Sequence, residues 1–164
     1  MLYFNKRHLL IAGAALLVSA CNFTPVYGPD GAGSKIENRI AVQAPTTKDA
    51  YHVTRRLETR LGRSDPAPIS LSFSVANSSA GLGATATGST TRLQRVGSLS
   101  YTLKNSATDK TISKGRVTNF TGYSATGNTA ATLAAERAAI ERLMIALADQ
   151  LVDRLLLLDP ATLP

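Results

Sequence analysis

The chain has 164 residues, with 18 basic and 11 acidic side chains and a formal net charge of +7. One cysteine and two histidines are too few for a disulfide framework or for most zinc and cysteine chemistry, so we expect no metal and no cofactor. The common serine-nucleophile motifs Ser-x-x-Lys and Gly-x-Ser-x-Gly are also missing from the sequence. We therefore predict no catalytic residues and a protein that is not an enzyme.

Residues 1–20 have the order of a secretory signal peptide. Lys6 and Arg7 precede an uncharged run from Leu9 to Val18, and the small residues Ser19 and Ala20 follow. The apolar run is shorter than the roughly 20 residues that a membrane-spanning helix needs. We expect this segment to be removed from the mature protein.

Val18-Ser19-Ala20-Cys21 resembles the bacterial lipobox, in which the cysteine sulfur receives a diacylglycerol and the signal is cut before it. Cys21 is then the lipidation site and carries three fatty-acid chains. Each buried methylene contributes about 0.8 kcal/mol, so three chains make the attachment effectively permanent. By resemblance to bacterial sorting rules, Asn22 indicates the outer membrane. The alternative is a secreted protein with a stray cysteine near its cleavage site.

The mature chain remains basic. Removal of residues 1–20 leaves 144 residues, enough for one domain, and the loss of Lys6 and Arg7 leaves 16 basic against 11 acidic side chains, or +5. An exported protein meets no genome, so we expect no nucleic acid as a partner. The acidic partners that fit are phosphates on membrane lipids or an acidic cavity in a protein.

The first predicted elements follow a tether. Residues 21–34 are rich in glycine and proline, which is typical of a flexible tether, and residues 35–164 form a single α/β domain. Residues 35–44 are predicted as a strand because Ile36, Ile40 and Val42 share one parity. A capping pattern from Thr46 to Asp49 precedes a predicted helix over about 47–61.

The second half of the chain predicts three strands and a long helix. Residues 69–75 alternate strictly between apolar residues and serines, and residues 92–104 and 111–123 suit a hairpin. Residues 77–91 suit a mobile loop, for which short strand extensions are an open alternative. Asn128 or Thr129 can cap a final helix that runs to about Leu158. Its apolar stripe should dock on the sheet face that carries Leu71, Phe73, Leu99 and Tyr101, and it consists of Leu133, Ile140, Leu143, Met144, Leu147, Leu151, Leu155 and Leu158.

Three titratable residues could be considered as catalytic groups, but we interpret each of them as a surface or packing residue. His52 lies on the first predicted helix between Tyr51 and Val53, where a lone histidine is usually a surface or packing residue. Asp149 and Asp153 are four residues apart on the last helix, and we interpret them as solvated helix charges rather than as paired catalytic carboxylates.

The opening of the mature chain, Cys-Asn-Phe-Thr-Pro-Val-Tyr-Gly over residues 21–28, is similar to the start of LptE lipoproteins of the alphaproteobacterial type. Ala-Ala-Glu-Arg-Ala at 134–138 and Leu-Ala-Asp-Gln-Leu at 147–151 also resemble that family. The resemblance implies an α+β fold, a small two-layer α/β sandwich in which a four-stranded mixed sheet carries two helices on one face, in the order β-α-β-β-β-α.

The same resemblance implies a function and partners. An LptE-like protein is anchored at the periplasmic face of the outer membrane, inserts into the lumen of the β-barrel translocon LptD, acts as its plug and assembly subunit, and supports insertion of lipopolysaccharide. Two other interpretations remain: an auxiliary lipoprotein of an ABC-type phospholipid transport system, and an envelope hydrolase. The missing acid, base and metal residues argue against the hydrolase.

Five basic residues near the predicted loop and hairpin are candidates for contact with the lipid A phosphates of lipopolysaccharide: Arg92, Arg95, Lys110, Lys114 and Arg116. Guanidinium groups can bind phosphate oxygens through two parallel hydrogen bonds, which favours Arg92 and Arg95. The alternative is that these are solvated strand charges that keep sheet edges from pairing with other chains.

Overall fold

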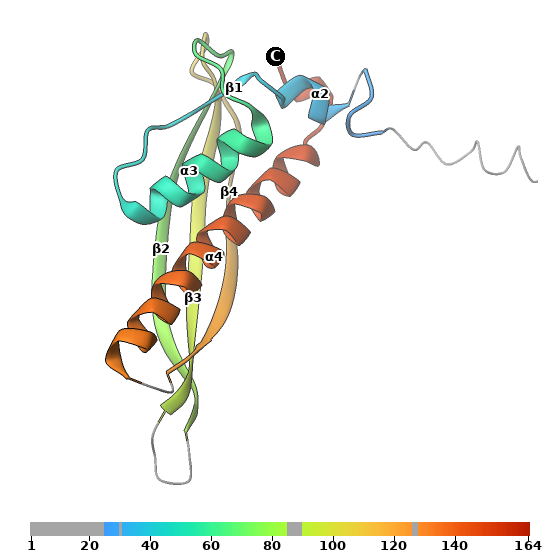
Figure 1. The fold of residues 1–164 in the computed structure, drawn as a ribbon. Coiled ribbons are helices and arrows are strands. Elements are labelled where there is room, and N and C mark those ends of the chain that lie inside the picture. Colours follow the sequence, from blue (N-terminus) through green and yellow to red (C-terminus); the bar gives the residue numbers. More distant parts are fainter. Residues whose placement is uncertain (1–24, 30, 85–89, 126–127) are drawn as a thin grey trace, which may run out of the picture.

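The computed structural model describes residues 25–29, 31–84, 90–125 and 128–164. They form a four-stranded sheet with two substantial helices (Figure 1). The elements in chain order are α2 (Ala32–Ile36), β1 (Ile40–Val42), α3 (Lys48–Leu61), β2 (Ile69–Ala84), β3 (Thr90–Asn105), β4 (Thr111–Ser124), α4 (Thr129–Leu156) and the 3-10 turn η1 (Pro160–Thr162).

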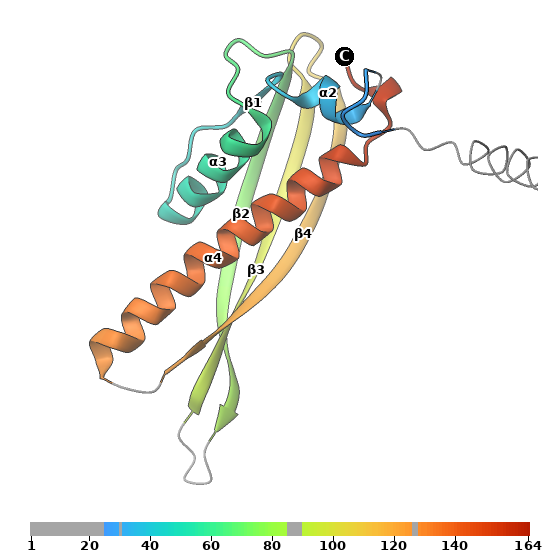
Figure 2. The same ribbon diagram turned by 45° about the vertical axis from the view of Figure 1, so that its right-hand side comes forward.

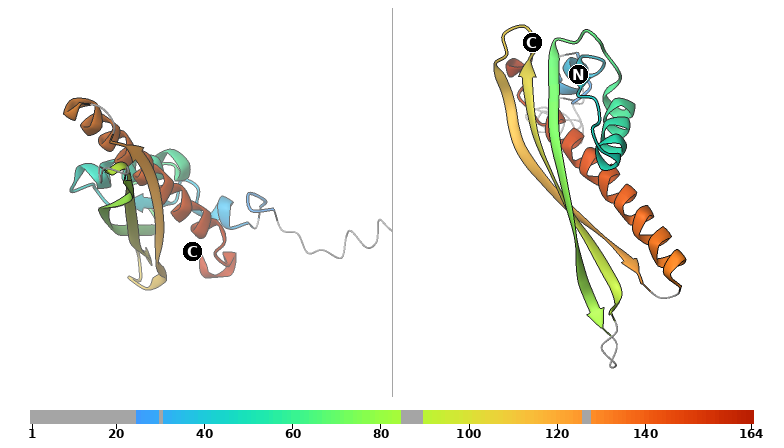
Figure 3. Two further views of the ribbon diagram at one scale, coloured as in Figure 1. Left: turned by 90° about the horizontal axis from the view of Figure 1, so that it is seen from below. Right: turned by 90° about the vertical axis from the view of Figure 1, so that its left-hand side faces the viewer.

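The sheet is mixed, and both long helices cover the same face. The strand order is β1-β2-β3-β4, with β1 parallel to β2 and the other neighbours antiparallel. Figure 3 shows α3 and α4 together on one side of the sheet. The predicted α+β architecture and its element order are confirmed, with α2 and η1 as short additions at the two ends.

Side-chain caps fix where the two long helices begin. Thr47 has extended backbone angles, and its hydroxyl accepts a hydrogen bond of 3.1 Å from the backbone N–H of Ala50. The cap is thus one residue later than the predicted Thr46. The Asn128 side chain accepts from the backbone N–H of Ala131 at 2.8 Å, so α4 begins at Thr129 as expected.

The core lies between the sheet and the helices. The strict alternation in β2 puts Ile69, Leu71 and Phe73 on the covered face, where all three are buried. The buried residues contributed by α4 to this core are Leu143, Met144, Leu147, Ala148, Leu151, Val152 and Leu155. The predicted docking of the α4 stripe on Leu71, Phe73, Leu99 and Tyr101 is confirmed.

Gly97 lets α4 approach the sheet closely. A Cβ atom at this position would lie 2.9 Å from Cδ2 of Leu143 and 3.0 Å from Cδ1 of Leu147. At the other end of the helix, Leu133 was predicted to belong to the stripe but is 43% exposed. The helix diverges from the sheet toward its N-terminus, so its first turns have no strand to pack on (Figure 2).

The predicted loop over 77–91 is largely strand. β2 continues to Ala84 and β3 begins at Thr90, with cross-strand pairs such as Asn77 with Gly97 and Ser79 with Arg95. Backbone hydrogen bonds hold this long hairpin together, and they need no large apolar side chain. Residues 85–89 of the predicted loop lie outside the described residues.

The N-terminal part of the domain also differs from the prediction. Residues 35 and 36 belong to α2, and β1 is limited to Ile40–Val42. Ile36 is buried in the core as a helical residue, so its parity with Ile40 is coincidental. Residues 25–29 and 31–34, predicted to be part of a flexible tether, form turns and the start of α2.

Candidate functional site

Most side chains on the uncovered face of the sheet are serine and threonine hydroxyls. Alternation turns every second residue of β2, β3 and β4 away from the helices. We call this surface the open face, and it consists of Ser70, Ser72, Ser74, Val96, Ser98, Ser100, Thr102, Lys114, Arg116, Thr118 and Phe120. A surface of this composition can make many hydrogen bonds and is positively charged. Besides Lys114 and Arg116 it carries Lys104, opposite Ser70, whose Nζ binds Asp109 at 2.9 Å.

Lys114 and Arg116 are the cations that β4 contributes to the open face. They are two residues apart on β4, so they point to the same side with about 7 Å between their backbones. Both are exposed, and Nε of Arg116 donates a hydrogen bond of 3.0 Å to the hydroxyl of Ser100 on β3. Lys110 is exposed in the turn before β4. Three of the five predicted cations therefore lie toward one end of the sheet.

An apolar pair lies on the same face. Val96 and Phe120 are directly opposite each other on β3 and β4, and they are 40% and 66% exposed. Phe120 is four residues from Arg116, a separation of about 14 Å along the strand. The open face thus presents cations and an exposed aromatic ring on the same surface, about 14 Å apart along β4. The sequence alone could have revealed this pair, because Val96 and Phe120 are apolar residues at strand positions that face away from the core, where the neighbouring residues are polar.

Arg92 is separated from these cations. It pairs with Ser124, eight residues further along β4 than Arg116, which corresponds to about 27 Å. Arg92 is exposed near the beginning of β3. The five predicted residues therefore do not form one phosphate-binding cluster.

Arg95 lies on the opposite, covered face and is engaged within the protein. Its guanidinium hydrogen-bonds the side-chain oxygen of Asn77 and forms an ion pair of 3.4 Å with Glu136 on α4. Asn77 in turn donates to Asp49 at 2.6 Å, at the start of α3. The Arg95 side chain is only 16% exposed, and its buried Nε has no hydrogen-bond partner among the described residues. This chain of contacts links α3, β2, β3 and α4 where the apolar core ends.

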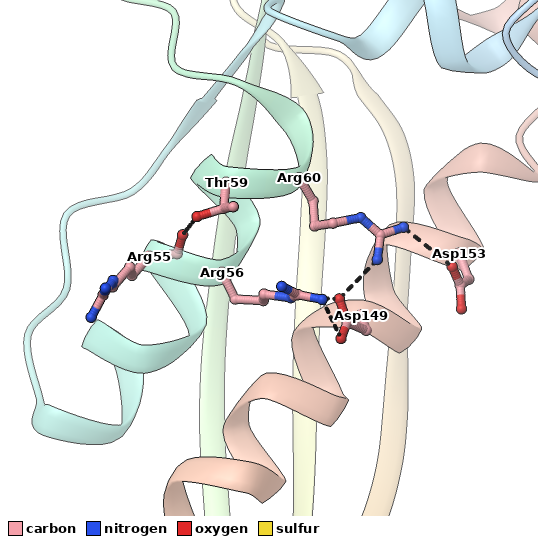
Figure 4. Close-up of polar contacts among 6 residues, drawn as sticks. All are labelled: Arg55, Arg56, Thr59, Arg60, Asp149 and Asp153. Atoms are coloured by element: carbon pink, nitrogen blue, oxygen red, sulfur yellow. Dashed lines mark hydrogen bonds and ion pairs between the residues drawn. The ribbon is translucent and has the colours of Figure 1, made fainter.

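A second group of charges joins the two helices (Figure 4). Arg56 binds both carboxylate oxygens of Asp149 at 2.8 and 3.0 Å, and Arg60 contacts Asp149 at 3.0 Å and Asp153 at 3.9 Å. The hydrogen bond and the negative charge of Asp149 raise the pKa of Arg56 above its ordinary value. The prediction of solvated charges is thus wrong for Asp149, which fastens α3 to α4, and fits Asp153, which is 69% exposed.

His52, which the sequence analysis interprets as a surface or packing residue, lies where α3 faces α4. Its Nδ1 is 3.8 Å from a carboxylate oxygen of Glu141, and both line an open cavity of about 310 Å³ between α3 and α4. Within the described ranges, no three His, Cys, Asp or Glu side chains gather as metal ligands would. In the same part of the chain, no helix combines the length and apolar character needed to cross a membrane.

Residues 38–155, from just before β1 to the last turn of α4, match the family LptE, described as lipopolysaccharide-assembly. The chain belongs to the LptE family. The predicted resemblance is therefore confirmed, and membership in this non-enzymatic family of envelope lipoproteins gives the chain a role in lipopolysaccharide assembly.

Solved structures of other lipoproteins share the LptE fold. A lipoprotein from Caulobacter crescentus CB15 is 20% identical with a TM-score of 0.62, over 76% of this chain and 92% of that one. Rare lipoprotein B from Shewanella oneidensis is 11% identical with a TM-score of 0.56, over 71% and 90%. A minor lipoprotein from Acinetobacter baumannii is 14% identical with a TM-score of 0.54, over 79% and 96%. A search of curated proteins gives no match.

Proposed function

We propose that this LptE family member is a lipid-anchored subunit at the periplasmic face of the outer membrane, which plugs an LptD-type β-barrel and supports lipopolysaccharide insertion. The family match over residues 38–155 carries the proposal, because it spans both long helices and all four strands. The sequence of residues 1–21 supports a cleaved signal and a lipid on Cys21; these residues lie outside the described part of the chain.

The open face supports direct contact with lipopolysaccharide. This lipid is an amphiphile, with phosphates on its lipid A head and acyl chains beside them. Lys114 and Arg116 offer positive charge for the phosphates, and Phe120 with Val96 offers an apolar surface close by. Lys110 directly precedes β4, toward the end of the sheet that carries Lys114, whereas Arg92 would act separately.

The contacts of Arg95 and Arg116 determine which of the two can bind phosphate. Arg95 is excluded from our proposal because its guanidinium already binds Asn77 and Glu136 on the covered face. Arg116 replaces it: the hydrogen bond from Nε to Ser100 orients the guanidinium and leaves its two terminal nitrogens for a phosphate.

Edge protection is the alternative role for these cations. β4 is an edge strand of the sheet, and charged residues on an edge prevent pairing with other chains. Charge reversal separates the two roles. Loss of phosphate contact weakens lipopolysaccharide binding by a protein that stays folded and monomeric, and loss of edge protection causes aggregation with binding intact.

The test is binding of lipopolysaccharide to the purified protein at two salt concentrations. We expect Lys114→Glu with Arg116→Glu to bind more weakly and with less salt dependence than the unmodified protein. The matched control is Lys48→Glu with Arg55→Glu, which makes the same charge change at two exposed positions of α3. Equal loss in both double variants would indicate a general charge effect, and unchanged binding in the first would overturn the assignment of Lys114 and Arg116.

The family match favours the barrel subunit over the auxiliary lipoprotein of a phospholipid transporter, because the matched family is one of lipopolysaccharide assembly. Depletion in the native bacterium distinguishes them further. We expect an LptD-type barrel to lose its assembled form and lipopolysaccharide to fail to reach the surface. A defect limited to phospholipid transport, with the barrel assembled normally, would support the alternative.

A further inference from the structure

The first described residues form a compact turn ahead of α2. The backbone N–H of Gly28 donates to Pro25, that of Gly31 to Gly28, and that of Gly33 to Val26, each at 2.9 Å. The hydroxyl oxygen of Ser34 lies 2.8 Å from the carbonyl oxygens of both Gly28 and Gly31, and its single proton can be donated to either one. Because these backbone groups are satisfied locally, the segment holds its shape without a neighbouring strand.

This turn is fixed to the domain. Ala32 and Ile36 of α2 are buried in the main core, and Nζ of Lys35 donates to the carbonyl oxygen of Pro160 at 2.8 Å. Figures 1 and 2 both show α2 beside the C-terminal end of α4. The position of Pro25 relative to the sheet is therefore set by packing.

Large apolar side chains are exposed at this same end. Val26, Tyr27 and Leu157 are 37%, 62% and 83% exposed. Val26 and Leu157 line one cleft of about 540 Å³, and the ring of Tyr27 packs on Gly33, where a Cβ atom would lie 2.7 Å from its Cδ1. They are three of the seven exposed large hydrophobic side chains found in the described part of the chain. Nothing within that part covers them.

The length of chain before Pro25 identifies what can cover them. Only residues 22–24 separate Cys21 from Pro25. At no more than about 3.6 Å per residue, Pro25 lies within roughly 14 Å of Cys21. If Cys21 carries lipid, residues 22–24 hold this apolar end at the membrane surface. The segment is far shorter than the domain, since α4 alone is about 42 Å long.

We propose that Val26, Tyr27 and Leu157 form a membrane seat, a surface that contacts the lipid bilayer next to the anchor. The proposal rests on the lipidation of Cys21, which is part of the proposed function. Tyrosine suits such a place, because its ring is apolar and its hydroxyl remains hydrated. The far ends of β2 and β3 lie at the opposite end of the molecule, so the seat directs the long hairpin away from the anchoring lipids (Figure 2).

The absence of tryptophan from the sequence allows a direct test. The full-length lipidated protein is reconstituted into vesicles of phosphatidylethanolamine and phosphatidylglycerol, with and without bromine on the acyl chains. One tryptophan is introduced by Tyr27→Trp or by Leu157→Trp. The matched control is Phe120→Trp, which changes an exposed aromatic residue on the open face.

We expect brominated lipid to quench the fluorescence of Tyr27→Trp and Leu157→Trp, with a blue shift, and to leave Phe120→Trp unchanged. Leu157→Trp keeps the test valid if Tyr27→Trp does not fold, because Leu157 is the most exposed of the three side chains. No quenching at either seat position, with fatty acid present on Cys21, would overturn the seat and leave the anchor intact. Equal quenching in all three variants would overturn a fixed seat, and absence of fatty acid on Cys21 would overturn both proposals.

Discussion

Leu147→Ala tests whether the covered face of the sheet is the stabilising core. Leu147 is fully buried, and its Cδ1 atom lies 3.0 Å from the position of a Cβ atom on Gly97, so the side chain fills the space directly above the β3 backbone. Truncation there leaves a cavity and costs about 2–5 kcal/mol, out of a total stability of about 5–15 kcal/mol. At roughly 3 °C per kcal/mol for a chain of this size, the melting temperature should fall by roughly 6–15 °C.

Thermal unfolding followed by circular dichroism measures this change. The matched control is Leu133→Ala, which removes the same atoms from the same helix at a position that is 43% exposed. Surface substitutions usually change stability by about 0.5 kcal/mol or less, so its melting temperature should stay within roughly 2 °C of the unmodified protein. Equal losses in the two variants would refute the placement of the α4 stripe.

Three further predictions concern charges and the anchor. Arg95→Ala should reduce the free energy of unfolding in urea by about 1.5–3 kcal/mol, since it breaks charged hydrogen bonds, whereas Arg92→Ala should have little effect; similar losses at the two positions would contradict the assigned contacts. Asp149→Asn should cost about 1 kcal/mol, more at low salt, because it weakens the pairing with Arg56, and no salt dependence would argue against that pairing. Cys21→Ser should leave an uncleaved precursor that takes up no labelled fatty acid, and normal processing would disprove the lipidation site.

The sequence predicted the elements whose side chains alternate against a core. Residues 69–75 were recognised because every second residue is apolar and buried, and α4 because its leucines recur on one side. Residues 77–84 were not recognised as strand because their side chains are small or polar and show no apolar alternation, although backbone pairing with β3 continues through them. α2 escaped because a glycine-rich segment of five helical residues has no period to detect.

The candidate site was harder to predict than the fold. Composition located the basic residues, but strand parity and register decide which face each one occupies. Arg95 has the parity of the buried Leu99 on β3 and binds Glu136 on the covered face, whereas Arg116 has the opposite parity to the buried Val117 on β4. The pairing of Asp149 with Arg56 depends on the packing of α3 against α4, 93 residues apart in sequence, which no local pattern reports.

We propose that this LptE family member works as the plug of an LptD-type barrel. The most direct measurement is affinity purification of the lipidated full-length protein from its native envelope, followed by identification of the stoichiometric partner. The proposal predicts an outer-membrane β-barrel of the LptD type in equal amount with this chain. Recovery of an inner-membrane ATPase complex instead, with no barrel present, would contradict it.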